Sequence, residues 1–230
     1  MHRKNPVVTL AFVLAITFLY VPLFYLIIQT FLVNPNDITS GLTLNWLIKL
    51  FEKGTLWEPL GTSLQIAVCS ATLSVILGTS GAVGLNPIAA WLPVWIQTLI
   101  MLPLLLPEVI TGLSLLLFFL LSRCPLGLFT VILAHASFSA SFVYFIMVEQ
   151  LRKLDPQIAE AAQDLGAHPR QVFWKVTLPN IVPGLMGSWL MAFTLSFDDF
   201  LISFFTSGSG VTTLPLKIYS LMRRGLSPEL

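Results

Sequence analysis

Five long apolar runs constrain the fold of this 230-residue chain more than any other feature. Each is at least as long as the roughly 20 residues that a helix needs to cross the hydrocarbon core of a bilayer. None alternates between apolar and polar residues as barrel strands do, and only a helix satisfies its own backbone hydrogen bonds in lipid. We therefore predict five transmembrane helices, over Val7–Val33, Leu60–Leu85, Trp95–Leu121, Leu126–Val148 and Ile181–Phe205.

Composition agrees with a membrane protein. The chain is 56% hydrophobic and 10% charged, against about a quarter charged in soluble domains. Its net charge of +1 gives no reason to propose nucleic acid as a partner. The cysteines, Cys69 and Cys124, are too few for a disulfide framework and lack metal-ligand spacing. We predict an all-α polytopic membrane helix bundle, residues 1–230 forming one domain, with unpaired cysteines and neither metal nor cofactor.

The basic residues are only a weak indicator of how the chain is oriented in the membrane. The first run is too long for a cleaved signal peptide, so it is predicted to stay as a helix. With the N-terminus inside, each side of the membrane receives six basic residues, but the first helix usually dominates. We predict a cytoplasmic N-terminus. The inner set is Arg3, Lys4, Arg152, Lys153, Arg170 and Lys175, and the outer set is Lys49, Lys53, Arg123, Lys217, Arg223 and Arg224.

The segment 149–180 is the only long polar loop that this topology places inside. It contains AEAAQDLGAHPRQVFWKVTLPN. Asp155-Pro156 is typical of a helix start and Gly166 of a helix stop, and we predict a second short helix that Pro179 ends. Apolar residues recur at helical spacing at Ile158, Ala161, Ala162 and Leu165. Such a face either docks into a groove on another protein or lies on the membrane surface as an amphipathic connector.

The same loop carries a family resemblance. Glu160-Ala161-Ala162, the glycine six positions later and Leu178-Pro179 resemble the EAA loop of permease subunits in binding-protein-dependent ABC importers. In that family the loop couples the membrane helices to a cytoplasmic ATPase. The resemblance implies that the coupling residues are Glu160, Ala161, Ala162, Gly166, Leu178 and Pro179.

The resemblance also implies partners and a location. These are two copies of the ATPase, a second related permease subunit and a periplasmic binding protein, with the chain in a bacterial inner membrane. The sequence contains no phosphate-binding GxxxxGK[ST] motif, so nucleotide must be handled by a partner and the chain is not expected to be an enzyme.

Three further stretches resemble the spermidine/putrescine branch of these permeases: PEVITGLSLLLFF, MAFTLSFDDFLISFF and LPLKIYSLMRRGLSPE. This branch normally has six helices, the sixth following the Ser-Pro-Glu of the tail. The chain reaches Leu230 without a sixth run, so that helix is expected to be missing. Which polyamine is preferred stays open, because selection can reside in the binding protein.

Acidic residues inside the apolar runs are the candidate substrate path. A carboxylate in a membrane span is costly unless it faces a bundle interior or an aqueous path. Asp198 and Asp199 in the fifth run, with Glu108 in the third, would make an anionic track, and Phe197 offers a ring for cation–π contact. Neighbours on a helix point about 100° apart, so we predict that Asp198 faces the path. Asp199 is then its neighbour or a structural hydrogen-bond acceptor.

Several alternatives stay open. The aspartate pair could have a purely structural role near the outer end of the helix. Glu108 could cap a broken helix after Pro107. His135 is predicted to be a hydrogen-bonded packing residue rather than a proton relay. An ion-coupled secondary transporter using Asp198, Asp199 and His135, or a non-transporting subunit that binds an ATPase, would share these features. Two further sets are structural: packing glycines Gly78, Gly81 and Gly84, and interface anchors Trp46, Trp57, Trp91 and Trp95.

Overall fold

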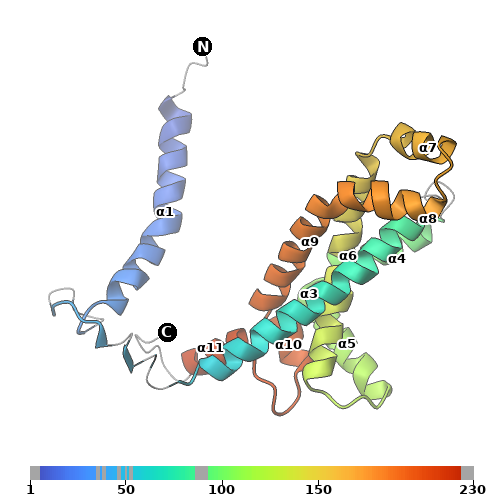
Figure 1. Ribbon diagram of the computed structural model, residues 1–230. Coiled ribbons are helices and arrows are strands. Elements are labelled where there is room, and N and C mark those ends of the chain that lie inside the picture. Colours follow the sequence, from blue (N-terminus) through green and yellow to red (C-terminus); the bar gives the residue numbers. More distant parts are fainter. Residues whose placement is uncertain are drawn as a thin grey trace. The chain divides into compact units, whose positions relative to one another are not determined.

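The computed structural model describes residues 6–34, 37, 40–45, 48–49, 51, 54–85 and 93–223. These residues are mostly helical (Figure 1), and within them the β pairing is an isolated bridge between Leu32 and Leu42. Several predictions, on Arg3, Lys4, Trp46, Lys53, Trp91, Arg224 and the tail Ser-Pro-Glu, lie outside the described residues. The helices are α1 Pro6–Thr30, α3 Trp57–Leu85, α4 Val94–Leu105, α5 Glu108–Leu121, α6 Leu128–Arg152, α7 Pro156–Asp164, α8 Pro169–Val172, the π-helix η2 Phe173–Thr177, α9 Leu178–Asp198, α10 Leu201–Thr206 and α11 Leu214–Met222.

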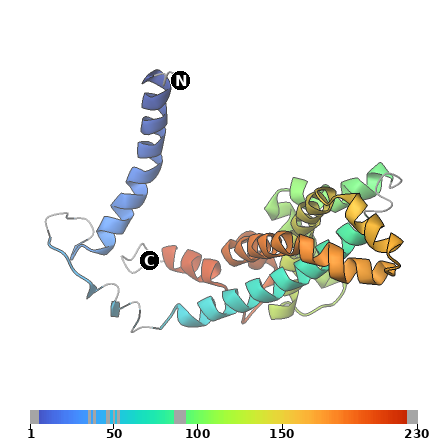
Figure 2. The same cartoon turned by 45° about the horizontal axis from the view of Figure 1, so that its top comes forward.

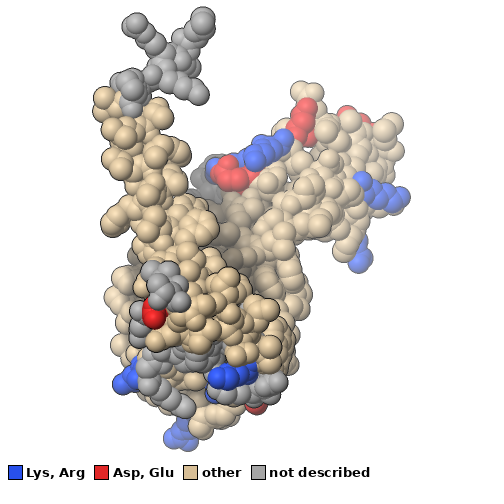
Figure 3. All heavy atoms as spheres, turned by 90° about the vertical axis from the view of Figure 1, so that its left-hand side faces the viewer, with Lys and Arg blue, Asp and Glu red and all other residues tan. Residues whose placement is uncertain are grey.

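The described residues fall into two compact units, one within Met1–Glu58 and Ile218–Leu230 and one within Pro59–Lys217. In the first unit, α1 carries no charged residue, and Figure 3 shows it as an uninterrupted tan column. Four helices are long and apolar enough to cross a membrane, or five spans if the bent pair α4 and α5 counts as one. The predicted all-α polytopic membrane protein is thereby confirmed.

The third predicted helix is not continuous. The chain bends by 108° between α4 and α5. Leu106 is extended, with φ −78° and ψ 138°, because a residue before proline is driven out of the helical region, and Pro107 follows it. The predicted third run, Trp95–Leu121, is therefore two helices that meet at Pro107, and a broken helix at this proline was one of the alternatives left open by the sequence.

The fifth predicted helix starts earlier and ends earlier than expected. The helical segment runs without a break from Pro169 to Asp198, so the prediction that Pro179 ends a short helix was wrong. In η2 the N–H of Leu178 bonds to the carbonyl of Phe173, which shifts the bonding register just before the proline. Because the hydrogen-bond register shifts here, the helix can continue through Pro179, which has no backbone N–H to donate. At the other end, α9 stops at Asp198 and α10 is separate.

The second unit is built around α6. Its face toward α3 and α9 forms one apolar cluster, consisting of Ala71, Ala82, Val143, Met147, Leu151, Ile181 and Ala192. Figures 1 and 2 both show α9 beside α6. Farther toward its N-terminus α6 meets α5 and α10 in a second cluster of Phe119, Ala134 and Ile202. His135 follows Ala134 directly, so the structure places a histidine in the interior of this bundle.

Of the predicted packing glycines, Gly78 makes the closest contact. A methyl group there would lie 2.7 Å from the carbonyl oxygen of Ala140 on α6. At Gly81 it would meet only the ring of Tyr144, at 3.4 Å, and at Gly84 nothing within 4 Å. Of these three glycines, Gly78 therefore lies in close contact with α6, whereas Gly84 faces open space. Trp57 and Trp95, the described anchors, are exposed, and both cysteines are unpaired as predicted.

Candidate functional site

A pocket of about 380 Å³ brings together acidic side chains from two helical breaks. Glu108 comes from the first residue of α5, and Asp198 and Asp199 from the end of α9. The remaining lining consists of Phe138, Thr194, Leu195, Phe200 and Leu201. The three carboxylates singled out in the sequence thus lie around one space, although 90 residues separate Glu108 from Asp198 along the chain.

Phe197 is not among the residues that line this pocket. Its ring stacks on Phe193, with centroids 5.8 Å apart and planes 9° apart, and Phe193 stacks in turn on Trp189. These three residues form an aromatic ladder along α9. The aromatic side chains that do line the pocket are Phe138 and Phe200.

The two aspartates have different environments because the helix ends between them. Asp198 is the last residue of α9 and is exposed, whereas Asp199 is extended, with φ −67° and ψ 128°. The assumption that both aspartates lie on one helix was therefore wrong. The Asp199 carboxylate accepts the backbone N–H of Ile202 at 3.3 Å and of Ser203 at 2.8 Å, so it caps the start of α10.

His135 lies behind Asp199 and is 2% exposed. Its Nε2 is 3.2 Å from Oδ2 of Asp199 and 3.0 Å from Oγ of Ser203, and its Nδ1 is 2.7 Å from Oγ of Ser196. Ser70 of α3 donates to Ser196 at 2.8 Å. The structure confirms that His135 is buried and hydrogen-bonded, as predicted. The sequence did not reveal these partners; the polar residues scattered through apolar runs were the signal available.

Glu108 and Asp198 differ from Asp199 in lacking partners. Within the described residues neither makes a hydrogen bond or ion pair. Pro107 occupies the N-cap position of α5, and no side chain makes a capping hydrogen bond to this helix end. The alternative that Glu108 caps the helix was therefore wrong. The pocket therefore presents two unpaired carboxylates beside one that the protein has satisfied internally. Two unpaired carboxylates with neighbouring rings suit a cation that carries more than one positive charge.

Most of the predicted coupling residues lie on an exposed hairpin of the short helices α7 and α8, whereas Leu178 and Pro179 begin α9. Asp155 caps α7 by accepting the N–H of Gln157 at 3.0 Å, and Pro156 occupies the first helical position. Gly166 ends it at φ +85°, and the two bonds that define a Schellman end are present, from Gly166 to Gln163 and from Ala167 to Ala162. Glu160 and Ala161 are exposed, as are Gly166 and Pro179, whereas Ala162 and Leu178 are half-buried.

Apolar side chains on this hairpin have no cover in the described structure. Ile158 is 53% exposed and Leu165 is 90% exposed. A helix of nine residues with such a face is short for independent stability in water, where isolated helices under about 12 residues are marginal. The caps at both ends and an uncovered apolar face are what a docking element requires.

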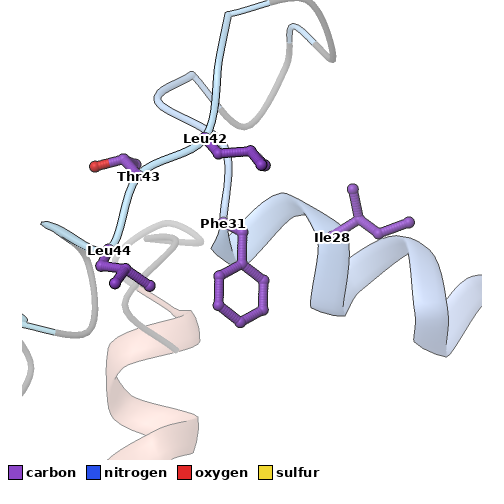
Figure 4. A pocket seen from close by; sticks show the side chains of 5 residues that line it. All are labelled: Ile28, Phe31, Leu42, Thr43 and Leu44. Atoms are coloured by element: carbon purple, nitrogen blue, oxygen red, sulfur yellow. The ribbon is translucent and has the colours of Figure 1, made fainter.

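Two other hollows offer different chemistry. One of about 460 Å³ is lined by Ile28, Phe31, Leu42, Thr43 and Leu44, from the end of α1 and the segment that follows it (Figure 4). None of these five lining residues has an ionisable side chain. The other lies along α8 and η2 and contains Arg170 and Lys175, which would repel a cation. No group of His, Cys, Asp and Glu arranged to hold a metal is found within the described residues.

Comparison with known proteins identifies the family. Residues 70–224 match the model of the binding-protein-dependent transport system inner membrane component. The chain is 39% identical to the putrescine transport system permease protein PotI of Escherichia coli K12, over 99% of this chain and 84% of that protein. It is 33% identical to the spermidine/putrescine transport system permease protein PotC of the same organism, over 92% of this chain and 81% of PotC. A PotC homolog of Mycoplasma genitalium is 30% identical over 98% of this chain and 84% of its own length. The chain therefore belongs to the family of binding-protein-dependent transport system inner membrane components, the multi-pass permease subunits of ABC importers.

Proposed function

We propose that this chain is a permease subunit of an ATP-driven polyamine importer, and that the pocket between Glu108 and Asp198 is part of the path. The observation that carries the proposal is the pair of unpaired carboxylates in a pocket otherwise lined by apolar and aromatic groups. The names of the relatives, which refer to putrescine and spermidine, agree with that chemistry.

A polyamine is a flexible chain with ammonium groups separated by methylenes. Its charges suit Glu108 and Asp198, and its methylenes suit Leu195 and Leu201. Two unit charges 4 Å apart attract by about 1 kcal/mol in bulk water and by about 4 kcal/mol at the effective dielectric of a protein surface. Phe138 and Phe200 can add cation–π contact worth about 0.5–2 kcal/mol. Phe197 is half-buried and stacks on Phe193, so in this proposal it supports α9 and does not touch the substrate.

Coupling is proposed to run through segment 149–180. In this proposal the N-terminus and the α7–α8 hairpin lie in the cytoplasm of a bacterium, and residues 1–230 act as one permease domain. The exposed apolar face at Ile158 and Leu165 would enter the ATPase, with Glu160, Ala161, Ala162 and Gly166 in contact and Leu178-Pro179 at the base of the loop. A second permease subunit, two ATPase copies and a periplasmic binding protein would complete the importer.

The test compares single carboxylate replacements in the complete importer. Asp198→Asn and Glu108→Gln keep size and remove charge, and each is expected to lower polyamine uptake at least tenfold while the complex still assembles. Asp199→Asn should instead lower stability, because it perturbs the cap of α10 and the contact with His135. Glu58→Gln is the matched control, since Glu58 is an exposed carboxylate in the first turn of α3, outside both the pocket and segment 149–180.

Uptake is measured in proteoliposomes with ATP and without an ion gradient. Transport that requires a gradient and not ATP would identify an ion-coupled transporter and overturn the proposal. Normal polyamine import by both Asp198→Asn and Glu108→Gln would remove the pocket from the path. ATPase binding with no transport by the unmodified chain in a complete complex would identify a non-transporting subunit.

A further inference from the structure

Side chains from three stretches of the chain that are distant in sequence, on α3, on α6 and between Ser196 and Ser203, form one network around a buried imidazole. Ser70 of α3, Ser196 of α9, Ser203 of α10 and the Asp199 carboxylate surround His135 of α6. Each of these serine residues is at most 5% exposed. Buried polar groups rarely gather in this way unless every member finds a partner, because an unsatisfied one costs free energy.

The hydrogen bonds form one consistent chain. An ionised carboxylate only accepts, so Nε2 of His135 must carry the hydrogen that faces Asp199. In the neutral ring Nδ1 then accepts from Ser196, whose oxygen accepts from Ser70. Because each donor in this series has an acceptor, the network fixes the ring plane of His135 and, through it, the Asp199 carboxylate.

Asp199 in turn controls where α10 begins. Its two oxygens accept the N–H groups of Ile202 and Ser203 while one of them also faces His135. Asp198 directly precedes it in the chain. Any displacement of the Asp199 carboxylate therefore changes both the direction of α10 and the position from which Asp198 enters the pocket.

The helix α10 is also locked to α5. A methyl group at Gly112 would lie 2.8 Å from Cδ2 of Phe205 and 3.4 Å from Cα of Ile202, so α5 and α10 are in close contact at this glycine. Gly112 is one helical turn after Glu108 on α5. A shift of α10 consequently shifts α5, and with it the carboxylate on the other side of the pocket.

We infer that His135 is a positioning residue of this permease: through Asp199 it sets the separation between the carboxylates of Glu108 and Asp198. The geometric inference stands on the contacts above, and its consequence for transport rests on the proposed function. A fixed separation between two carboxylates discriminates between cations whose ammonium groups are spaced differently. His135 would then help set the preference between a diamine and a triamine without touching either.

Two amide replacements test this inference. In His135→Gln the amide nitrogen can reach the place of Nε2 and keep the bond to Asp199. In His135→Asn the shorter side chain reaches only toward Ser196 and loses Asp199. Ser80→Ala is the matched control, because the Ser80 hydroxyl, on the same helix α3 as Ser70, donates to the carbonyl of Ile76 and lies outside this network.

The first measurement is a distance that does not involve polyamine. Spin labels are attached at Val109 on α5 and Leu190 on α9, both exposed, after Cys69 and Cys124 are replaced by serine. The unmodified protein, His135→Gln and Ser80→Ala should give the same narrow distance distribution, and His135→Asn a shifted or broadened one. If His135→Asn merely lowers thermal stability and leaves the distribution unchanged, His135 is structural and the inference fails. If that variant does not assemble, Asp199→Asn takes its place with the same expected shift and the same refuting result.

The second measurement is the ratio of putrescine to spermidine uptake at saturating binding protein. A loss of assembled complex lowers both rates by the same factor, so only a change in pocket geometry alters the ratio. We expect His135→Asn to change it at least threefold and His135→Gln to leave it unchanged. A changed distance in His135→Asn, with no polyamine uptake by the unmodified importer, refutes the proposed function and leaves the positioning role in place. An unchanged ratio together with a changed distance refutes the consequence for substrate preference.

Discussion

Replacing Gly78 by alanine should separate α3 from α6. The added methyl would meet three atoms that cannot turn aside easily: the Ala140 carbonyl oxygen at 2.7 Å, Cβ of Val143 at 2.7 Å and the backbone nitrogen of Tyr144 at 2.8 Å. Two of these belong to the α6 backbone, so relief requires one helix to move. Gly81→Ala and Gly84→Ala, on the same helix, meet a movable ring and open space respectively.

The magnitude follows from three contributions. Alanine favours the helix over glycine by about 1 kcal/mol at every position. At Gly78 overpacking opposes this with about 1–3 kcal/mol. Moving α3 also strains the bond from Ser74 to the carbonyl of Ala136, 3.1 Å long and one turn away, which is worth about 0.5–1.5 kcal/mol. Gly84→Ala should therefore be the more stable variant by about 2–4 kcal/mol, with Gly81→Ala between them.

The assay is reversible unfolding in mixed micelles, in which SDS is titrated and tryptophan fluorescence is followed. The free energies of unfolding of the three variants are compared with that of the unmodified protein. If Gly78→Ala proves at least as stable as Gly84→Ala, α3 does not lie against α6 as described, and the network from Ser70 to His135 loses its support.

Three further predictions can be checked separately. Gly166→Ala should strain the end of α7 by about 1–2 kcal/mol, because φ at this position is +85° while no other atom lies within 4 Å of the added methyl group. This variant should weaken copurification of the ATPase. Gly187→Ala, in a helical position with open space around the added methyl group, should not. Asp199→Asn should lower the unfolding temperature in detergent more than Asp198→Asn, since only Asp199 has internal partners; equal effects would contradict the described capping. In a chain without Cys69 and Cys124, a cysteine near Lys217 should react with an impermeant reagent from outside and one near Arg170 should not, and the reverse pattern would invert the proposed topology.

Sequence reasoning worked best where the signal was local and repeated. Apolar runs of about 20 residues predicted the helices, and Asp155-Pro156 with Gly166 predicted both ends of α7 because caps depend on a few neighbouring residues. It failed where one residue interrupts a periodic pattern. Pro107 and Asp199 each end a helix within a run that remains apolar on both sides, so hydropathy alone continued the helix through them.

The network around His135 could not be predicted from the sequence, for a different reason. Its members come from α3, α6, α9 and α10, and their register depends on how closely these helices approach. That approach is fixed by Gly78 against Ala140 and by Gly112 against Phe205, contacts that become visible only when the helices are placed in space. The observed serine partners of His135 lie on other helices, α9 and α10.

The two helix breaks, at Pro107 and at Asp199, explain the position of the pocket. Non-helical backbone at membrane depth is tolerated only where it is buried in protein or lines an aqueous cavity, because its freed polar groups need partners. Proline at 107 contributes no N–H that would need one, and Asp199 supplies acceptors for the first N–H groups of α10. Asp199 is therefore used to make the break, whereas Glu108 and Asp198, placed beside the two breaks, have no internal partner. We therefore propose that the two breaks and the two carboxylates form one functional arrangement, in which water or a passing cation meets the charges.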